Sequence, residues 1–169
     1  MVLTNLNKLK ELDEREKFDK IVCLGDMYYA GPLCDMEVNS QKVLEFLNGF
    51  KDRLIAVRGN CDSDVDIKVS DFPVCDNLSF INVDNLNLYL THGNVYNIDN
   101  KPKFNHNEIL VYGHKHYPFI IKEDGNVFIN VGSILLPRNN SNPTYGIYHN
   151  GMFRIYDIYE NEIKFIQFR

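Results

Sequence analysis

Four apolar runs in the sequence end in short turns that contain glycine and side chains able to bind a metal ion. The turns read "LGD", "RGNCD", "LTHG" and "YGHKH". One carboxylate, one amide oxygen and three imidazoles from these turns are ligands that manganese, iron, zinc or nickel accept. Divalent ions of this kind hold a phosphate and activate water. The sequence therefore predicts a metal site with these ligands: Asp26, Asn60, His92, His114 and His116.

Each residue also has an ordinary structural interpretation. Asp26 could cap a helix, Asn60 could form an Asx turn, and Cys61 could be a small buried apolar residue. His92 could be a hydrogen-bonded histidine of no catalytic use. The metal site is favoured because all four turns follow apolar runs typical of strands. In open α/β sheets the carboxyl ends of the strands form the crevice where ligands bind.

The elements that must position these turns alternate in the first half of the chain. Helical periodicity is present over residues 3–18 and 36–50. Short, unbroken apolar runs at 21–24 and 54–57 predict strands buried on both faces. Helix, strand, helix, strand indicates parallel strands joined by crossovers.

The second half predicts antiparallel strands. Residues 78–93 contain two strands joined at Asp84-Asn85, and residues 108–116 contain another. Asp124-Gly125 lies between two β-rich runs, which is a strong hairpin signal. Residues 145–168 indicate a three-stranded meander. We expect one α/β domain over residues 1–169, with two sheets facing each other and helices outside.

Composition excludes several classes of function. The chain has 169 residues and a net charge of −5, which disfavours a broad nucleic-acid surface. No apolar run approaches the ~20 residues of a membrane span, and the charged first 18 residues do not resemble a signal peptide. The four cysteines form no CxxC pair, so we expect reduced thiols in a cytoplasmic protein.

The order "GD", "GNCD", "THG", "GHKH" resembles the calcineurin-like metallophosphoesterase superfamily. "VRGNCD", "NVGSILLPR" and "PTYGI" are similar to its branch of small bacterial phosphodiesterases of the YfcE type. The resemblance covers nearly the whole chain. It implies a ββ sandwich flanked by helices that holds two metal ions.

The resemblance also implies roles for the ligands. Asp26 would bridge the two metals. Asn60, His92 and His114 would complete the second metal site, and His116 would bind the first metal.

Three neighbouring residues are the predicted catalytic residues by resemblance. Asn60 and Cys61 would face the phosphate. Cys61 stands where most of the superfamily has a histidine that stabilises the transferring phosphoryl group or protonates the leaving oxygen. Asp62 would be a supporting carboxylate that orients its neighbours.

The superfamily begins with a strand that ends in Asp-x-His-Gly and supplies two ligands of the first metal. This motif is absent, so we expect a chain that is N-terminally truncated relative to the family and lacks the first strand. The first metal would keep only Asp26 and His116, whereas the second would keep a full set. Loss of a central strand would also leave neighbouring strand edges unpaired.

The expected function is hydrolysis of small phosphodiesters by metal-activated water. Manganese is the favoured metal, with zinc, nickel and iron left open. The alternative is a non-catalytic scaffold or a degenerate remnant of the same fold. No nucleic acid or membrane is expected as a partner, and a homo-oligomer is left open.

Overall fold

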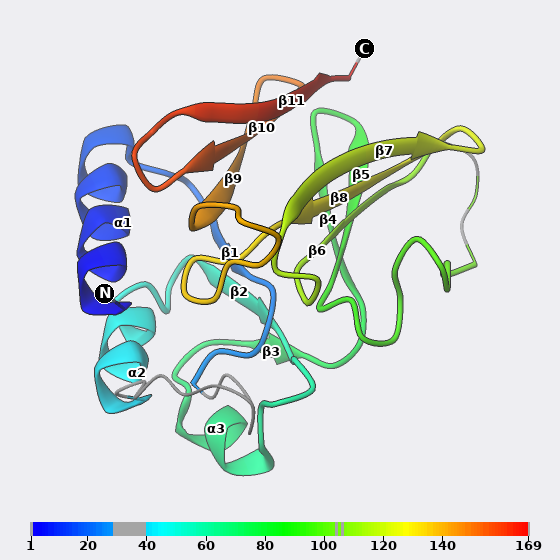
Figure 1. The fold of residues 1–169 in the computed structure, drawn as a ribbon. Coiled ribbons are helices and arrows are strands. Elements are labelled where there is room, and N and C mark those ends of the chain that lie inside the picture. The colour runs from blue at the N-terminus through cyan, green and yellow to red at the C-terminus, as the bar shows by residue number, and fades with distance from the viewer. Residues whose placement is uncertain (1, 29–39, 104, 106, 169) are drawn as a thin grey trace.

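The protein is described here from a computed structural model, which covers residues 2–28, 40–103, 105 and 107–168 (Figure 1). The helices are α1 (Val2–Glu16), α2 (Ser40–Asn48) and α3 (Asp64–Val69). The strands of the first half are β1 (Ile21–Cys23), β2 (Leu54–Val57), β3 (Val74–Cys75), β4 (Ser79–Val83) and β5 (Leu86–Thr91). Those of the second half are β6 (Ile109–Tyr112), β7 (Pro118–Glu123), β8 (Asn126–Val131), β9 (Thr144–His149), β10 (Met152–Asp157) and β11 (Glu162–Gln167).

The described strands form three hydrogen-bonded sheets. One has five strands in the order β4-β5-β6-β8-β7, and the others have the orders β1-β2-β3 and β11-β10-β9. β1 and β2 pair in parallel, as the alternation of helix and strand predicts. β5, β6 and β8 are also parallel neighbours, so their carboxyl ends lie at one edge of the five-stranded sheet.

The antiparallel hairpins form where the sequence predicts them. Asp84 and Asn85 have φ values of 51° and 60°, and they join β4 to β5. Asp124-Gly125 and Asn150-Gly151 also have positive φ and close the hairpins β7–β8 and β9–β10. A positive φ at both central residues is what a type I′ turn requires, because its twist matches that of the flanking strands.

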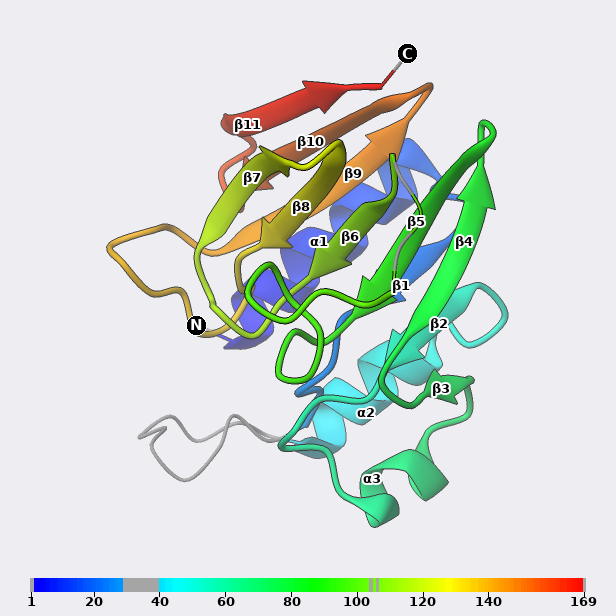
Figure 2. The same ribbon diagram turned by 90° about the vertical axis from the view of Figure 1, so that its right-hand side faces the viewer.

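The three sheets make a two-layer sandwich. The main core joins β2, through Val57, and β10, through Phe153 and Ile155, to Val111 and Ile129 of the five-stranded sheet. Both three-stranded sheets therefore pack on the same face of the five-stranded sheet (Figure 2). The predicted α/β sandwich is confirmed, with one of its layers divided between two sheets.

Helices α1 and α2 cover the outer face of β1 and β2. Alternation along β2 sends Leu54 and Ala56 toward the helices, where they pack with Leu6, Val43 and other apolar residues. Ile55 and Val57 point the other way, into the sandwich. Each face of this strand is therefore buried, as the unbroken apolar run predicts.

The first predicted strand differs from expectation. β1 has three residues, and its central residue Val22 is 37 % exposed. The prediction of a strand buried on both faces is therefore wrong for β1. The physical reason is its place, since β1 is an edge strand that pairs only with β2 among the described residues.

The predicted helices agree with the structure where both are described. α1 forms over most of residues 3–18, where helical periodicity predicts a helix, and α2 begins at Ser40. Residues 36–39 of the second predicted helix lie outside the described part, as do Cys34 and the side chain of Leu3. α3 was not predicted; a capping box between Ser63 and Asp66 starts it. In the described part of the chain, no helix has the length and apolar character needed to cross a membrane.

Candidate metal centre

The turns that follow β1, β2, β5 and β6 meet at one place between the layers. His92 Nε2 lies 3.2 Å from Asp26 Oδ2 and 3.1 Å from Asn60 Oδ1. His114 Nδ1 lies 3.1 Å from the same nitrogen. Ligand atoms of Asp26, His92 and His114 all lie within 4.8 Å of one another. Side chains from four separate turns thus converge as the sequence predicts.

The backbone conformation of the turns explains why they aim inward. Asp26 and His114 have φ values of 54° and 58°, in the left-handed region that costs energy for residues other than glycine. Gly59 makes room for Asp26, since a Cβ atom there would lie 2.2 Å from Asp26 Oδ1 and 2.3 Å from Asp26 N. The local backbone is therefore shaped around the Asp26 carboxylate.

The donor set fits a divalent cation. His92 Nδ1 donates to the Leu24 carbonyl oxygen at 2.6 Å, because a carbonyl can only accept. In the neutral ring this leaves a lone pair on Nε2, which faces the carboxylate oxygen of Asp26 and the amide oxygen of Asn60. Three electron-rich atoms aimed at one point repel each other unless a proton or a cation lies between them. Carboxylate, amide and imidazole together suit a borderline divalent ion.

The pKa values of Asp26, His92 and His114 are shifted by the interactions among these three side chains. Burial acts to raise the pKa of Asp26, but hydrogen bonding to His92 outweighs it, and the pKa is lowered. Burial acts to lower the pKa of His92, yet the Asp26 carboxylate raises it overall. Burial and the neighbouring His92 lower the pKa of His114, which keeps that ring neutral at pH 7. An ionised carboxylate beside a neutral imidazole is the state that binds a metal.

Asp62 ties two of the turns together. Its carboxylate is 4 % exposed and accepts the backbone N–H groups of Asp26 at 2.9 Å, Met27 at 2.7 Å and Gly59 at 2.8 Å. It makes no contact with the ligand atoms in the described structure. Its position is that of a residue which orients the turns around it.

The structure places the remaining predicted residues around the cluster. The backbone N–H of Cys61 donates to Asp26 Oδ1 at 2.9 Å, and its Sγ lies 3.3 Å from Asn60 Nδ2. Burial, with the Asp26 charge next in size, raises the pKa of the Cys61 thiol, so it stays protonated at neutral pH. His116 lies outside the three-residue cluster, and its Nδ1 donates to the Leu136 carbonyl oxygen at 2.9 Å.

One supporting residue was missed by sequence reasoning. Asn130 is fully buried, its side-chain amide donates to the Gly113 carbonyl oxygen, and its Oδ1 accepts the Gly132 N–H at 3.0 Å. It thereby fixes the turn that carries His114. The signal was a polar residue inside the apolar run "VFINVG", which a buried strand tolerates only with hydrogen-bond partners.

The sequence and the structure of the chain were both found to be similar to those of known phosphoesterases. The model of the calcineurin-like phosphoesterase superfamily domain matches residues 3–151. The phosphodiesterase YfcE of Escherichia coli strain K12 is 34 % identical over 146 residues, which are 85 % of this chain and 79 % of that protein. The solved structure of Yfce, a phosphoesterase from E. coli, superposes with a TM-score of 0.93 at 30 % identity, covering 99 % of this chain and 93 % of that one.

More distant structures share the fold alone. Vps29 of Chaetomium thermophilum superposes with a TM-score of 0.63 at 14 % identity and covers 95 % of this chain and 87 % of its own. The family model, by contrast, spans most of the sequence and includes all four turns of the site. This chain belongs to the calcineurin-like phosphoesterase superfamily, and its chemistry is that of a hydrolytic phosphoesterase.

Proposed function

We propose that this protein is a metal-dependent phosphodiesterase that hydrolyses small phosphodiesters. The observation that carries the proposal is the convergence of Asp26, His92 and His114 on one point, with Asn60 Oδ1 beside them. The 34 % identity to a protein named phosphodiesterase supports the diester as the class of substrate.

Four side chains would hold the metal ion: Asp26, Asn60, His92 and His114. When bound, a divalent ion supplies positive charge that polarises a phosphoryl oxygen and lowers the pKa of water. The Leu24 carbonyl oxygen fixes the ring of His92 with Nε2 toward Asp26 and Asn60, where it would be a ligand of the ion. Asp62 holds the turns of Asp26 and Gly59 against each other through three backbone N–H groups.

The catalytic roles proposed for the "GNCD" turn rest on the positions of the Asn60 and Cys61 side chains. Asn60 lies at the cluster through its Oδ1, while its Nδ2 points toward the Cys61 sulfur. We assign to these two residues the contact with the substrate phosphate. The Cys61 thiol remains protonated, so it serves as a weak hydrogen-bond donor to a phosphate oxygen rather than as a nucleophile.

The remaining proposals concern the identity of the metal, a second metal ion and the location of the protein in the cell. Manganese is the proposed ion, because the set of one carboxylate, one amide and imidazoles contains no thiolate and suits that metal. His116 is proposed as a ligand of a second ion, held more weakly. Three free cysteines among the described residues are consistent with a cytoplasmic, reducing setting.

A direct assay tests the proposed activity. Purified protein is treated with a chelator, loaded with Mn²⁺ and given bis(p-nitrophenyl) phosphate. We expect hydrolysis that depends on Mn²⁺ and is lost in His114→Ala, because one of four ligands is removed. His149→Ala is the matched control, since His149 is exposed and its ring is hydrogen-bonded to Asn150 Nδ2 at 3.0 Å, outside the described cluster. Activity that survives both chelation and His114→Ala contradicts the proposal.

A non-catalytic scaffold is the second candidate. The fold shared with Vps29 structures is the observation that favours it. The two candidates differ in metal uptake, so calorimetric titration with Mn²⁺ separates them. Stable binding of a partner protein by a chain that takes up no metal would identify a scaffold.

A further inference from the structure

Arg138 is an exposed arginine that lies beside one residue of the predicted site. It belongs to the loop between β8 and β9, residues 132–143 (Figure 2). Its backbone N–H donates to the carbonyl oxygen of His116 at 2.9 Å. Earlier in the same loop, the Leu136 carbonyl oxygen accepts from His116 Nδ1 at 2.9 Å. The loop thus runs along the turn that carries His116 and places Arg138 next to it.

Further hydrogen bonds fix the backbone around Arg138. Its carbonyl oxygen accepts from the backbone N–H of Ser141 at 3.1 Å and from the Ser141 hydroxyl at 2.8 Å. The side-chain amide of Asn5 donates to the Ile134 carbonyl oxygen at 2.8 Å, which ties the loop to α1. The backbone of Arg138 is therefore held in place, although the residue is exposed. A charged side chain on a fixed backbone is suited to hold a ligand in one orientation.

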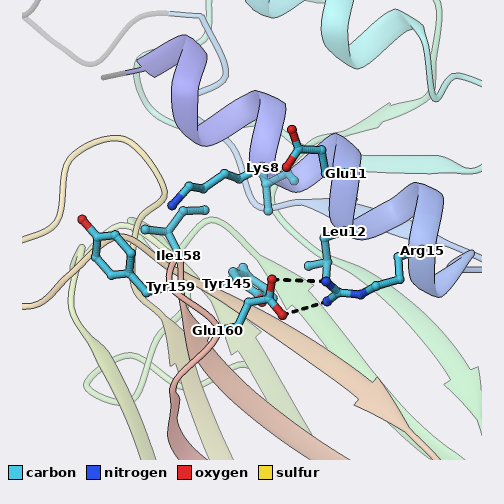
Figure 3. A pocket seen from close by; sticks show the side chains of 9 residues that line it. Lys8, Glu11, Leu12, Arg15, Tyr145, Ile158, Tyr159 and Glu160 are labelled. Carbon is cyan, nitrogen blue, oxygen red and sulfur yellow. Dashed lines mark hydrogen bonds and ion pairs between the residues drawn. The ribbon is translucent and has the colours of Figure 1, made fainter.

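The guanidinium of Arg138 has no carboxylate partner, unlike the other arginines that the structure describes. Each of those others forms an ion pair: Arg15 with Glu160, Arg53 with Asp13, Arg58 with Asp64, and Arg154 with Glu162. Figure 3 shows the first of these pairs, which lines a cavity beneath α1. Within the described ranges, no carboxylate pairs with Arg138. Its positive charge is therefore available to an anionic ligand.

The charge of Arg138 acts next to the three-residue cluster rather than at its centre. Burial lowers the pKa of the His116 ring, and the positive charge of Arg138 is the next cause. His116 itself lies outside the cluster. Lys115 is the neighbouring cation that acts on His114, and its ammonium lies 3.6 Å from the Asp99 carboxylate, which offsets its charge. Arg138 is thus the uncompensated cation beside His116 in the described structure.

We propose that Arg138 determines substrate specificity by binding a second anionic group, a carboxylate or a phosphate, on one ester arm of the substrate. The proposal rests on the proposed phosphodiesterase function, because the diester itself is the first anionic group and binds at the metal centre. A guanidinium binds either kind of oxyanion through two parallel N–H groups. The substrate class is therefore a small phosphodiester with an anionic group at the end of one arm.

The position of Arg138 predicts which kinetic constant responds. The anionic end of the arm takes no part in the reaction, so its contact with Arg138 is equally strong in the ground state and in the transition state. Such a contact lowers KM and leaves kcat unchanged. A charge-assisted contact of this kind should change kcat/KM by about tenfold.

A matched series of p-nitrophenyl diesters tests the proposal. The second arm ends in a carboxylate, a phosphate or a neutral carboxamide, and each end group is made in the same series of arm lengths. With Mn²⁺-loaded protein, kcat/KM at the best length should be about tenfold higher for an anionic end than for the carboxamide, through KM. The end group with the larger ratio identifies the preferred anion.

Substitutions at Arg138 connect this preference to its guanidinium. In Arg138→Gln the ratio of kcat/KM between anionic and carboxamide arms should fall to about one, and in Arg138→Glu below one. Arg138→Lys should give an intermediate ratio, because an ammonium lacks the two parallel N–H groups. All three variants keep the backbone N–H that bonds His116. Arg154→Gln is the matched control and should keep the parent ratio, since Arg154 pairs with Glu162.

Equilibrium binding provides a readout that does not depend on turnover. A phosphonate with a carboxylate arm of the best length is compared with its carboxamide by calorimetric titration of the Mn²⁺-loaded protein. The carboxylate should bind about tenfold more tightly in the parent, and the two should bind equally in Arg138→Gln.

Two results would overturn the proposal. One is the same ratio of anionic to carboxamide arms in the parent and in Arg138→Gln. The other is an equal loss of kcat for every arm in Arg138→Gln, because Arg138 would then act on the reacting phosphate. Absence of Mn²⁺-dependent hydrolysis for all diesters would contradict the phosphodiesterase function instead, and the phosphonate titration would still decide whether Arg138 binds the second anion.

Discussion

His92 Nε2 lies 3.2 Å from the Asp26 carboxylate, although the two residues follow strands of different sheets. The contact joins the two layers of the sandwich at the carboxyl ends of β1 and β5. A metal ion bound there would be held by both layers at once. Binding should therefore stabilise the fold as well as support catalysis.

The first prediction concerns metal-linked stability. Mn²⁺ at about 100 times its dissociation constant should raise the free energy of unfolding by about 2.7 kcal/mol, because it binds only the folded chain. Asp26→Ala removes one ligand and should abolish this gain. The measurement is urea denaturation with and without Mn²⁺. An equal gain in Asp26→Ala and the parent would show that the ion binds elsewhere.

The second prediction concerns the space beside Asp26. Gly59→Ala places a Cβ atom 2.2 Å from Asp26 Oδ1, so the carboxylate must move. We expect Mn²⁺ affinity to fall by at least about tenfold in calorimetric titration. Gly113→Ala is the matched control, because its nearest neighbour would lie 3.7 Å away. Similar losses in the two variants would mean that the close approach at Gly59 is unimportant.

The third prediction concerns the buried carboxylate of Asp62. Asp62→Ala leaves the N–H groups of Asp26, Met27 and Gly59 without this acceptor. The free energy of unfolding should fall by about 3 kcal/mol or more. Asp64→Ala should change it by less than about 1 kcal/mol, because that side chain is 80 % exposed in its ion pair with Arg58. Chemical denaturation measures both, and equal effects would contradict the role of Asp62.

The fourth prediction concerns pH and Asp157. Burial acts to raise the pKa of this carboxyl, which is 1 % exposed, but hydrogen bonds from Asn161, Asn142 and the Tyr159 N–H outweigh it and lower the pKa below 3.8. A carboxyl with a lowered pKa in the fold stabilises it above the unfolded value. This contribution is lost as pH falls through the folded pKa.

Urea denaturation of the parent and Asp157→Asn over a pH series measures this contribution. The parent should lose stability more steeply than the variant below about pH 4, and the two curves should run parallel above about pH 6. Parallel curves at all pH values would show that Asp157 does not titrate differently in the fold.

Local signals in the sequence predicted most of the fold. The hairpins were predictable because Asp-Gly and Asn-Gly have few alternatives to a tight turn, and β2 because its unbroken apolar run needs burial on both faces. The exposure of Val22 was not predictable from its own run, since it depends on which strand lies beside β1. The short α3 was missed because six residues give too little periodicity to detect.

The sequence indicated which residues belong to the candidate site, but it did not indicate how far apart their side chains lie. Glycine after an apolar run indicated the turns that carry Asp26, Asn60, His92 and His114. His116 lies outside the three-residue cluster, and its Nδ1 contacts the Leu136 carbonyl oxygen, 20 residues further along the chain, which sequence spacing alone does not reveal. Asn130 was missed because its partners, Gly113 and Gly132, come together only when β6 and β8 pair.

Asp26, His114 and His116 all have left-handed backbone, which is strained for residues other than glycine. Glycine would adopt these conformations with less strain, so a chain selected for folding alone should drift toward glycine at such positions. Asp26→Gly would relieve that strain while removing the carboxylate. At these three positions, backbone strain is therefore set against the side chains proposed as metal ligands.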